Sequence, residues 1–153
     1  MTDSGARSGV RSDRRWDFGA SRAEVWTALT AVDRYRAWWP WLRRFEANAF
    51  AQGERWRCTI KPQLPYRLHF DIVLETVVER ELAVAHLEGD LNGWARLSLA
   101  DDPDGCQLRL ISELQAVGGP ARVAARVAPR IASAGHDWVL DRGIRQFRAK
   151  ALS

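Results

Sequence analysis

Hydrophobic and polar residues alternate along most of the middle of the chain, and this period of two predicts β-strands. In residues 54–61, Trp56, Cys58 and Ile60 fall on one face and mainly basic side chains fall on the other. The segments that share this alternation are 54–61, 66–75, 82–88, 94–100 and 106–115. Turn sequences rich in Asp, Asn and Gly join consecutive segments, which favours an antiparallel meander with one apolar face and one polar face.

A first strand and two short helices are predicted ahead of the meander. Residues 15–20 alternate Trp, Phe and Ala with polar positions, as a half-buried strand does. Ser21 and Glu24 form a capping-box pattern, which predicts a helix that begins directly after this strand. Asp33 fits the N-cap of a second short helix, which must end before Pro40 because proline disfavours helical geometry in the preceding residue.

The C-terminal part of the chain predicts one long, alanine-rich helix. Pro120 follows two glycines and fits its first turn. One narrow face carries five residues at helical spacing: Ser133, His136, Leu140, Ile144 and Phe147. Pro129 and Gly135 are positions at which the helix is expected to kink.

The length and composition favour one globular domain. A chain of 153 residues that is 46% hydrophobic and 27% charged can bury a core without disulfides or metal. Residues 1–13 lack both periodicity and the apolar region of a signal peptide, so we expect a disordered tail there and a single domain over 14–153. No apolar run reaches the roughly 18 to 20 residues of a membrane span. A cytoplasmic protein is therefore expected.

The charge and the cysteines narrow the classes of partner. The net charge is +4, but the basic residues are spread along the chain and are matched by 19 acids, which argues against nucleic-acid binding. Cys58 and Cys106 lack metal-ligand spacing and fall at apolar strand positions. We expect them to be buried free thiols, and we predict neither a metal nor a cofactor.

The strands and helices together predict an α+β protein, and two stretches resemble a known superfamily. The opening SRAEVWTALTAVDRYRAWWPWL at 21–42 and the ending AGHDWVLDRGIRQF at 134–147 are similar to sequences of the SRPBCC superfamily, the START-like group that includes polyketide cyclases and dehydrases. The ending is similar to the bacterial polyketide-cyclase-like branch. The resemblance implies the helix-grip fold: a curved antiparallel sheet of about six to seven strands wrapped around a long C-terminal helix, with two short helices between strands 1 and 2.

The resemblance also implies an internal cavity between the sheet and the long helix. In the run YRAWWPWL at 35–42, neither a helical nor a strand period explains the three tryptophans. Trp38 and Trp41, with Leu42, would line the mouth of this cavity. The alternative is that these rings simply pack in the core. The residues expected to contact a ligand are Trp26, Trp38, Trp41, Trp56, Cys58, Tyr66, Phe70, Leu97, Leu110, Ser112, His136 and Leu140.

The inward positions are mostly apolar, which favours binding of a small hydrophobic molecule such as a lipid, a polyketide-like compound or an aromatic compound. An enzyme of the cyclase or dehydratase type is an alternative, with His136 as proton carrier and Ser112 or Tyr66 orienting a carbonyl. His136 also fits a structural histidine, and the chain contains no established catalytic sequence motif.

A protein-interaction module is the third alternative. The polar face of the sheet carries opposed basic and acidic residues, typical of cross-strand pairs in water, with Trp94 expected to point outward among them. An exposed Trp39 or Trp94 would also favour a homodimer. His69 and His86 are expected to point away from the apolar side. Asp137 and Asp141, one helical turn apart, are expected to form a solvated face.

Overall fold

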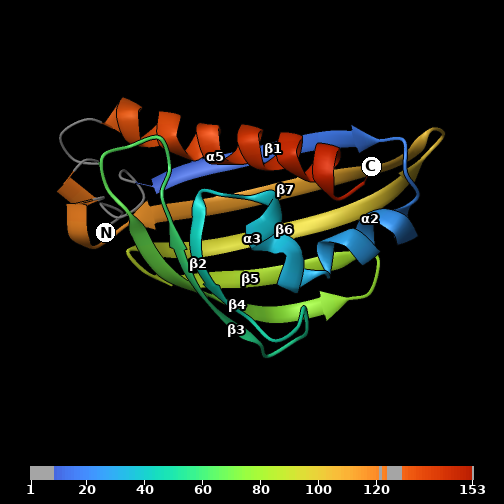
Figure 1. The fold of residues 1–153 in the computed structure, drawn as a ribbon, viewed down its shortest axis with the longest axis horizontal. Coiled ribbons are helices and arrows are strands. Elements are labelled where there is room, and N and C mark those ends of the chain that lie inside the picture. The colour runs from blue at the N-terminus through green and yellow to red at the C-terminus, as the bar shows by residue number, and fades with distance from the viewer. Residues whose placement is uncertain (1–8, 121, 124–128, 153) are drawn as a thin grey trace, which may run out of the picture.

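An antiparallel sheet and one long helix dominate the structure (Figure 1). The computed structural model describes residues 9–120, 122–123 and 129–152. In this part of the chain, seven strands form one sheet in the order β1-β7-β6-β5-β4-β3-β2. The strands are β1 Gly9–Phe18, β2 Leu42–Glu46, β3 Arg55–Ile60, β4 Leu68–Val78, β5 Leu82–Gly89, β6 Leu91–Asp102 and β7 Gly105–Ala116.

The helices lie on one side of the curved sheet. The long helix α5, Pro129–Lys150, runs across it close to β1 and β7, while β3 and β4 curl away beneath (Figure 1). Helix α2, Arg22–Leu29, the 3₁₀ helix η1, Val32–Arg34, and helix α3, Tyr35–Trp38, connect β1 to β2. The predicted α+β class is therefore confirmed, as are the sheet of six to seven strands and the short helices between strands 1 and 2.

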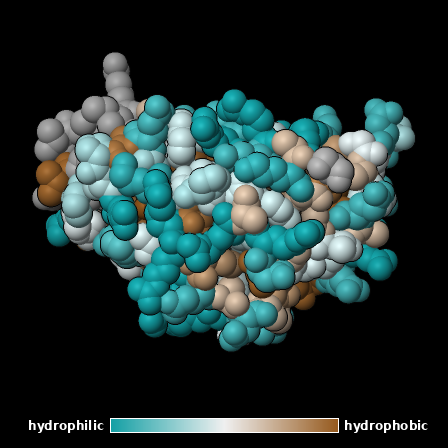
Figure 2. Space-filling model, viewed as in Figure 1, coloured by the Kyte–Doolittle hydropathy of each residue, from teal (hydrophilic) through white to brown (hydrophobic). Residues whose placement is uncertain are grey.

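The strand register explains why one face of the sheet is apolar. Trp56 of β3 pairs with Ile72 of β4, and Cys58 pairs with Phe70. Directly opposite residues point to the same side of a sheet, so these apolar side chains lie together on one face. The helix closes over this face, where Phe147 of α5 is only 1% exposed. The surface seen in Figure 2 is mostly hydrophilic with small hydrophobic patches, because most large apolar side chains lie inside.

The N-terminal half departs from the prediction in three places. Strand β1 begins at Gly9, so residues 9–13, expected in a disordered tail, pair in register with β7. Strand β2 was not predicted, since its sequence LRRFE places exposed basic residues at the sheet edge. Asp33 is not an N-cap: the chain enters η1 at Ala31 and α3 at Arg34, neither with a side-chain cap. The capping box of Ser21 and Glu24 is confirmed at α2.

The C-terminal helix is confirmed over Pro129–Lys150. Residues 119–120 and 122–123 are also helical, but 124–128, part of the helix expected from Pro120, lie outside the described residues. Within the described ranges, no helix combines the length and the apolar character that crossing a bilayer demands. Cys58 and Cys106 are free thiols, 3% and 0% exposed, as predicted.

Candidate functional site

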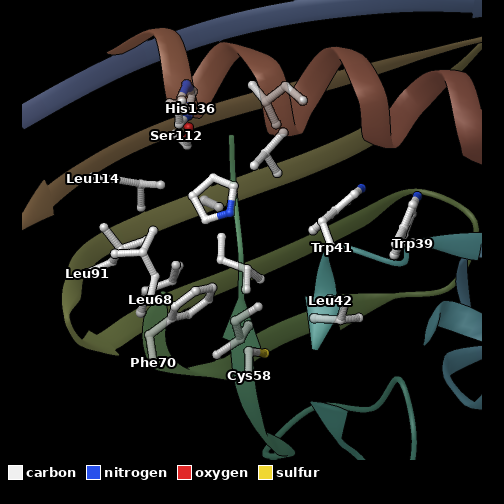
Figure 3. A pocket seen from close by; sticks show the side chains of 18 of the residues that line it. Trp39, Trp41, Leu42, Cys58, Leu68, Phe70, Leu91, Ser112, Leu114 and His136 are labelled. Atoms are coloured by element: carbon white, nitrogen blue, oxygen red, sulfur yellow. The ribbon is translucent and has the colours of Figure 1, made fainter. Parts of the chain in front are cut away.

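A cavity of about 390 Å³ lies between the apolar face of the sheet and α5 (Figure 3). Its wall combines alternate residues of β3 to β7, the corner between α3 and β2, and the inward face of α5. This volume is in the range of small-molecule pockets, which start at roughly 300 Å³. The helix and the sheet therefore leave space between them.

Nine of the twelve residues predicted to contact a ligand line this cavity: Trp41, Trp56, Cys58, Tyr66, Phe70, Leu110, Ser112, His136 and Leu140. Trp26, Trp38 and Leu97 do not line it. Trp26 is buried on α2 with its ring centroid 5.3 Å from that of Phe50, and Leu97 packs against the core. These three residues have the expected apolar surroundings, but they lie away from the cavity wall.

Trp38 and Trp39 both differ from the prediction, because Trp39 and not Trp38 lines the cavity. Trp38 is a core residue, 5% exposed, with its ring 5.6 Å from Phe147. Trp39 lines the cavity and is half-buried, so it does not form the exposed surface expected of it. It stacks on Trp41 with 5.6 Å between ring centroids, and Figure 3 shows the two indoles side by side.

The pair of Trp39 and Trp41 connects the turn between α3 and β2 to helix α5. The Trp39 indole N–H donates to the carbonyl of Gly143, and the Trp41 indole N–H donates to Oε1 of Gln146, both at 2.9 Å. Each half-buried indole N–H therefore has the hydrogen-bond partner that it needs in a largely apolar environment. The pair forms one wall of the cavity and holds the helix in place.

Many aliphatic wall residues were not predicted as ligand contacts, although they follow the same period of two. They include Ile60, Leu68, Ile72, Ala85, Leu87, Leu91, Ala95 and Leu114. The alternation already placed most of them on the apolar face. The alternation does not predict how far each residue lies from α5. This distance determines whether a side chain contacts the helix or lines the cavity.

The titratable groups of the wall are neutral near pH 7. Burial raises the pKa of Cys58 to about 12. Burial also raises the pKa of Tyr35, whose hydroxyl donates to the carbonyl of Leu29. For His136 burial lowers the pKa, and the neighbouring carboxylate of Asp137 opposes this only in part. Among the described lining residues none is Asp, Glu, Lys or Arg.

Arg14 of β1 binds two carboxylates of α5 at the outer edge of this site. Its guanidinium donates to Asp137 and to Asp141, each at 2.7 Å. Asp137 and Asp141 were expected to form a solvated face. They remain about half exposed, yet they join the helix to the first strand of the sheet.

A glycine allows the loop between β3 and β4 to approach α5. A Cβ atom built on Gly135 would lie 2.5 Å from Cδ1 of Leu64, closer than any real contact of this kind. Gly135 and Leu64 both line the cavity. The loop therefore closes part of the space beneath the helix, and a larger residue at position 135 would require the Leu64 side chain to move.

The outer face of the sheet carries polar networks. His86 binds Glu75 at 2.6 Å and Glu88 at 3.0 Å, and Arg55 joins Glu88 to Asp71. His69 and His86 point outward, as predicted. Trp94 lies on the outer face, because the next residue, Ala95, points inward to the cavity. Its side chain is half-buried.

In the ranges that the structure describes, no three His, Cys, Asp or Glu side chains are placed to hold a metal.

Solved structures of low sequence identity share this architecture. The protein of unknown function SA2116 from Staphylococcus aureus aligns over 95% of this chain and 97% of its own, with a TM-score of 0.66 and 12% identity. The di-domain ARO/CYC StfQ from the steffimycin biosynthetic pathway gives the same score and identity over 95% of this chain and 52% of that one. Ara h 8.0201 aligns over 87% and 99%, with a TM-score of 0.58 and 12% identity.

These similarities concern the fold. Comparison with models of protein families finds no match, and a search of curated proteins finds none. Proteins at 12% identity share the arrangement of strands and helices, while the chemistry of each site depends on its own side chains.

Proposed function

We propose that this chain, which has the helix-grip fold of the SRPBCC superfamily, binds one small, mostly hydrophobic molecule in the cavity beneath α5. The observation that carries the proposal is an apolar space of about 390 Å³ left open between the sheet and the helix. Leaving such a space unfilled costs stability, roughly 24 cal/mol per Å³ in cores that are emptied by mutation. An apolar guest would recover part of that cost by contacting the wall.

The composition of the wall supports a hydrophobic ligand. Trp39, Trp41, Phe70 and several leucines offer large, rigid apolar surfaces. A charged ligand would lose its hydration without finding an opposite charge among the described lining residues. A lipid-like, polyketide-like or aromatic molecule fits these requirements.

An enzymatic role of the cyclase or dehydratase type is a second candidate. It is favoured by one observation, the position of His136 in the cavity wall. We favour binding over catalysis because His136 lacks, among the residues that the structure describes, a free carboxylate to orient it. The neighbouring carboxylate, that of Asp137, already forms an ion pair with Arg14. A general base is usually oriented by a hydrogen-bonded partner, and the His136–Asp137 distance of 3.6 Å is too long for one.

A neutral fluorescent probe, N-phenyl-1-naphthylamine, tests the binding proposal. Its emission should rise on addition of the protein, because the dye moves from water into an apolar site. The substitution Ala95→Phe fills the cavity from β6 and should weaken binding at least about tenfold, equivalent to 1.4 kcal/mol.

Ala100→Phe is the matched control, since Ala100 lies on the same strand and is exposed. The control should bind the dye as the wild type does. Absence of dye binding by the wild type, or equal affinity in the Ala95 and Ala100 variants, would contradict the proposal.

A further inference from the structure

Besides the tyrosines and tryptophans of the wall, two of the described polar side chains line the cavity, Ser112 and His136. Ser112 of β7 is 3% exposed, one of the two buried polar side chains in the described residues. His136 of α5 keeps 15% of its side chain accessible, and its Nδ1 is buried without a hydrogen-bond partner in the described part of the chain. A nitrogen that is buried without a hydrogen bond is unusual, and because Nδ1 is itself inaccessible, only the rest of the His136 ring, with Nε2, can meet a ligand in the cavity that this residue lines.

The topology brings these two residues to the same end of the cavity. On β1 and β7, Ser12 pairs with Ser112 and Arg14 pairs with Leu110. The Arg14 side chain reaches up to Asp137, the residue that follows His136 on α5. The helix therefore passes His136 over this stretch of β7. In Figure 3 His136 and Ser112 are at the side of the cavity next to α5, whereas Leu68, Phe70 and Cys58 lie farther from the helix.

The surroundings of His136 determine which hydrogen bonds it can offer. Nδ1 lies 3.6 Å from Oδ1 of Asp137, too far for a strong hydrogen bond, but near enough for the carboxylate to favour the tautomer with its proton on Nδ1. Nε2 is then an acceptor. Burial lowers the pKa of this ring, which keeps it neutral at pH 7, and the charge of Arg14 acts in the same direction. The hydroxyl of Ser112 can both donate and accept.

We propose that Ser112 and His136 together bind a hydroxyl group at one end of an otherwise apolar ligand, an alcohol or a phenol. The ligand hydroxyl donates to Nε2 of His136 and accepts from the hydroxyl of Ser112, and the apolar part extends toward Leu68 and Phe70. The inference rests on the proposed binding function. A carboxylate fits poorly, because it offers only acceptors and brings a charge into a wall whose described residues include no Lys or Arg.

Isothermal titration calorimetry with three naphthalene probes that differ in one substituent tests this assignment: 2-naphthol, 2-methylnaphthalene and 2-naphthoate. For the wild type we expect 2-naphthol to bind about tenfold more tightly than 2-methylnaphthalene, and 2-naphthoate to bind most weakly. Ser112→Ala and His136→Leu should each weaken 2-naphthol about five- to tenfold and leave 2-methylnaphthalene unchanged. His136→Gln, which keeps a neutral acceptor, should retain part of the preference.

Ser12→Ala is the matched control, because Ser12 is the partner of Ser112 on the neighbouring strand but does not line the cavity. It should leave all three affinities unchanged. Circular dichroism checks the fold of each variant, and Ser112→Ala with His136→Gln completes the test should His136→Leu unfold.

The outcomes separate this inference from the proposed function. Equal binding of 2-naphthol and 2-methylnaphthalene by the wild type and the variants would overturn the hydroxyl site and leave hydrophobic binding standing. Tightest binding of 2-naphthoate would overturn the choice of a hydroxyl. Failure of all the probes, together with failure of the fluorescent dye, would overturn both proposals.

Discussion

Adjacent residues of the tryptophan-rich segment differ in their surroundings. Trp38 is fixed in the core against Phe147, while Trp39 lines the cavity and donates to the backbone of α5. The sequence places both rings near the helix, but neither a helical nor a strand period orients them. Only the turn between α3 and β2 determines which ring points to the core and which to the cavity.

His86 leads to a prediction for the pH dependence of stability. Its hydrogen bond with Glu75 above all, and also its bond with Glu88, raise its pKa above the ordinary value of 6.5. The folded state therefore holds this proton more tightly than the unfolded state. The resulting stabilisation is fully present below about pH 6.5 and is lost as the pH rises through the folded-state pKa.

Urea denaturation of the wild type and of His86→Gln at pH 5.5 and pH 8.5 measures this effect. The difference in free energy of unfolding between the two proteins should be larger at pH 5.5. Comparison with the variant cancels the opposite contribution of His136, whose pKa is lowered in the folded state. A difference that is equal at the two pH values, or larger at pH 8.5, would contradict the role assigned to the Glu75–His86–Glu88 network.

At the scale of elements, close pairing of β6 with β7 depends on a glycine. Gly93 has a φ of 145°, and a Cβ atom at this position would lie 2.0 Å from the carbonyl oxygen of Glu113 on β7. Gly93→Ala should lower the free energy of unfolding by at least about 2 kcal/mol, because both the backbone and the strand pairing must shift.

Thermal and urea denaturation check this value. Gly19→Ala serves as the control, since Gly19 lacks a positive φ and a Cβ atom there meets nothing within 4 Å. It should change the stability by less than about 0.5 kcal/mol. A similar loss in both variants would show that the contact with Glu113 is unimportant.

The sequence predicted the elements whose burial follows a simple period. Strands β3 to β7 and the inward face of α5 were found because one face of each is buried against the other layer. The start of β1 and the edge strand β2 were missed, since paired charges such as Asp13 with Arg109 take the place of an apolar pattern there. For the site, the period gave the facing direction of strand residues such as Leu97 but not their distance to α5. Trp26 and Trp38 lie on α2 and α3, and Trp38 was expected at the cavity mouth because of the resemblance, not because of a period.

At the scale of the whole molecule, the first strand and the last helix depend on each other. Arg14 of β1 binds Asp137 and Asp141 of α5, and Arg148 of α5 donates to the backbone of Asp17. The same strand pairs with β7 along its whole length. Helix α5 is thus held at one edge by β1 and at the other by the tryptophan pair, and the cavity lies between these two attachments.

Arg14→Gln tests the attachment to β1. The side chain is 28% exposed and its partners are about half exposed, so the loss should be modest, about 1 kcal/mol in the free energy of unfolding, and smaller at high salt. Hydrogen exchange at residues 137–141 should become faster. Arg11→Gln, at an exposed position of the same strand, is the control and should leave both measurements unchanged. Identical behaviour of the two variants would contradict the role given to Arg14.

The pairing of β1 with β7 also has a consequence for biosynthesis. Phe18 pairs with Cys106, 88 residues later in the chain. On the ribosome, strand β1 emerges long before its neighbour β7 has been translated, and helix α5, which covers it, follows β7 in the chain. Contacts of such long separation slow folding. The nascent chain must therefore keep the apolar side of this strand, with Trp16 and Phe18, from associating elsewhere until β7 and α5 have been synthesised.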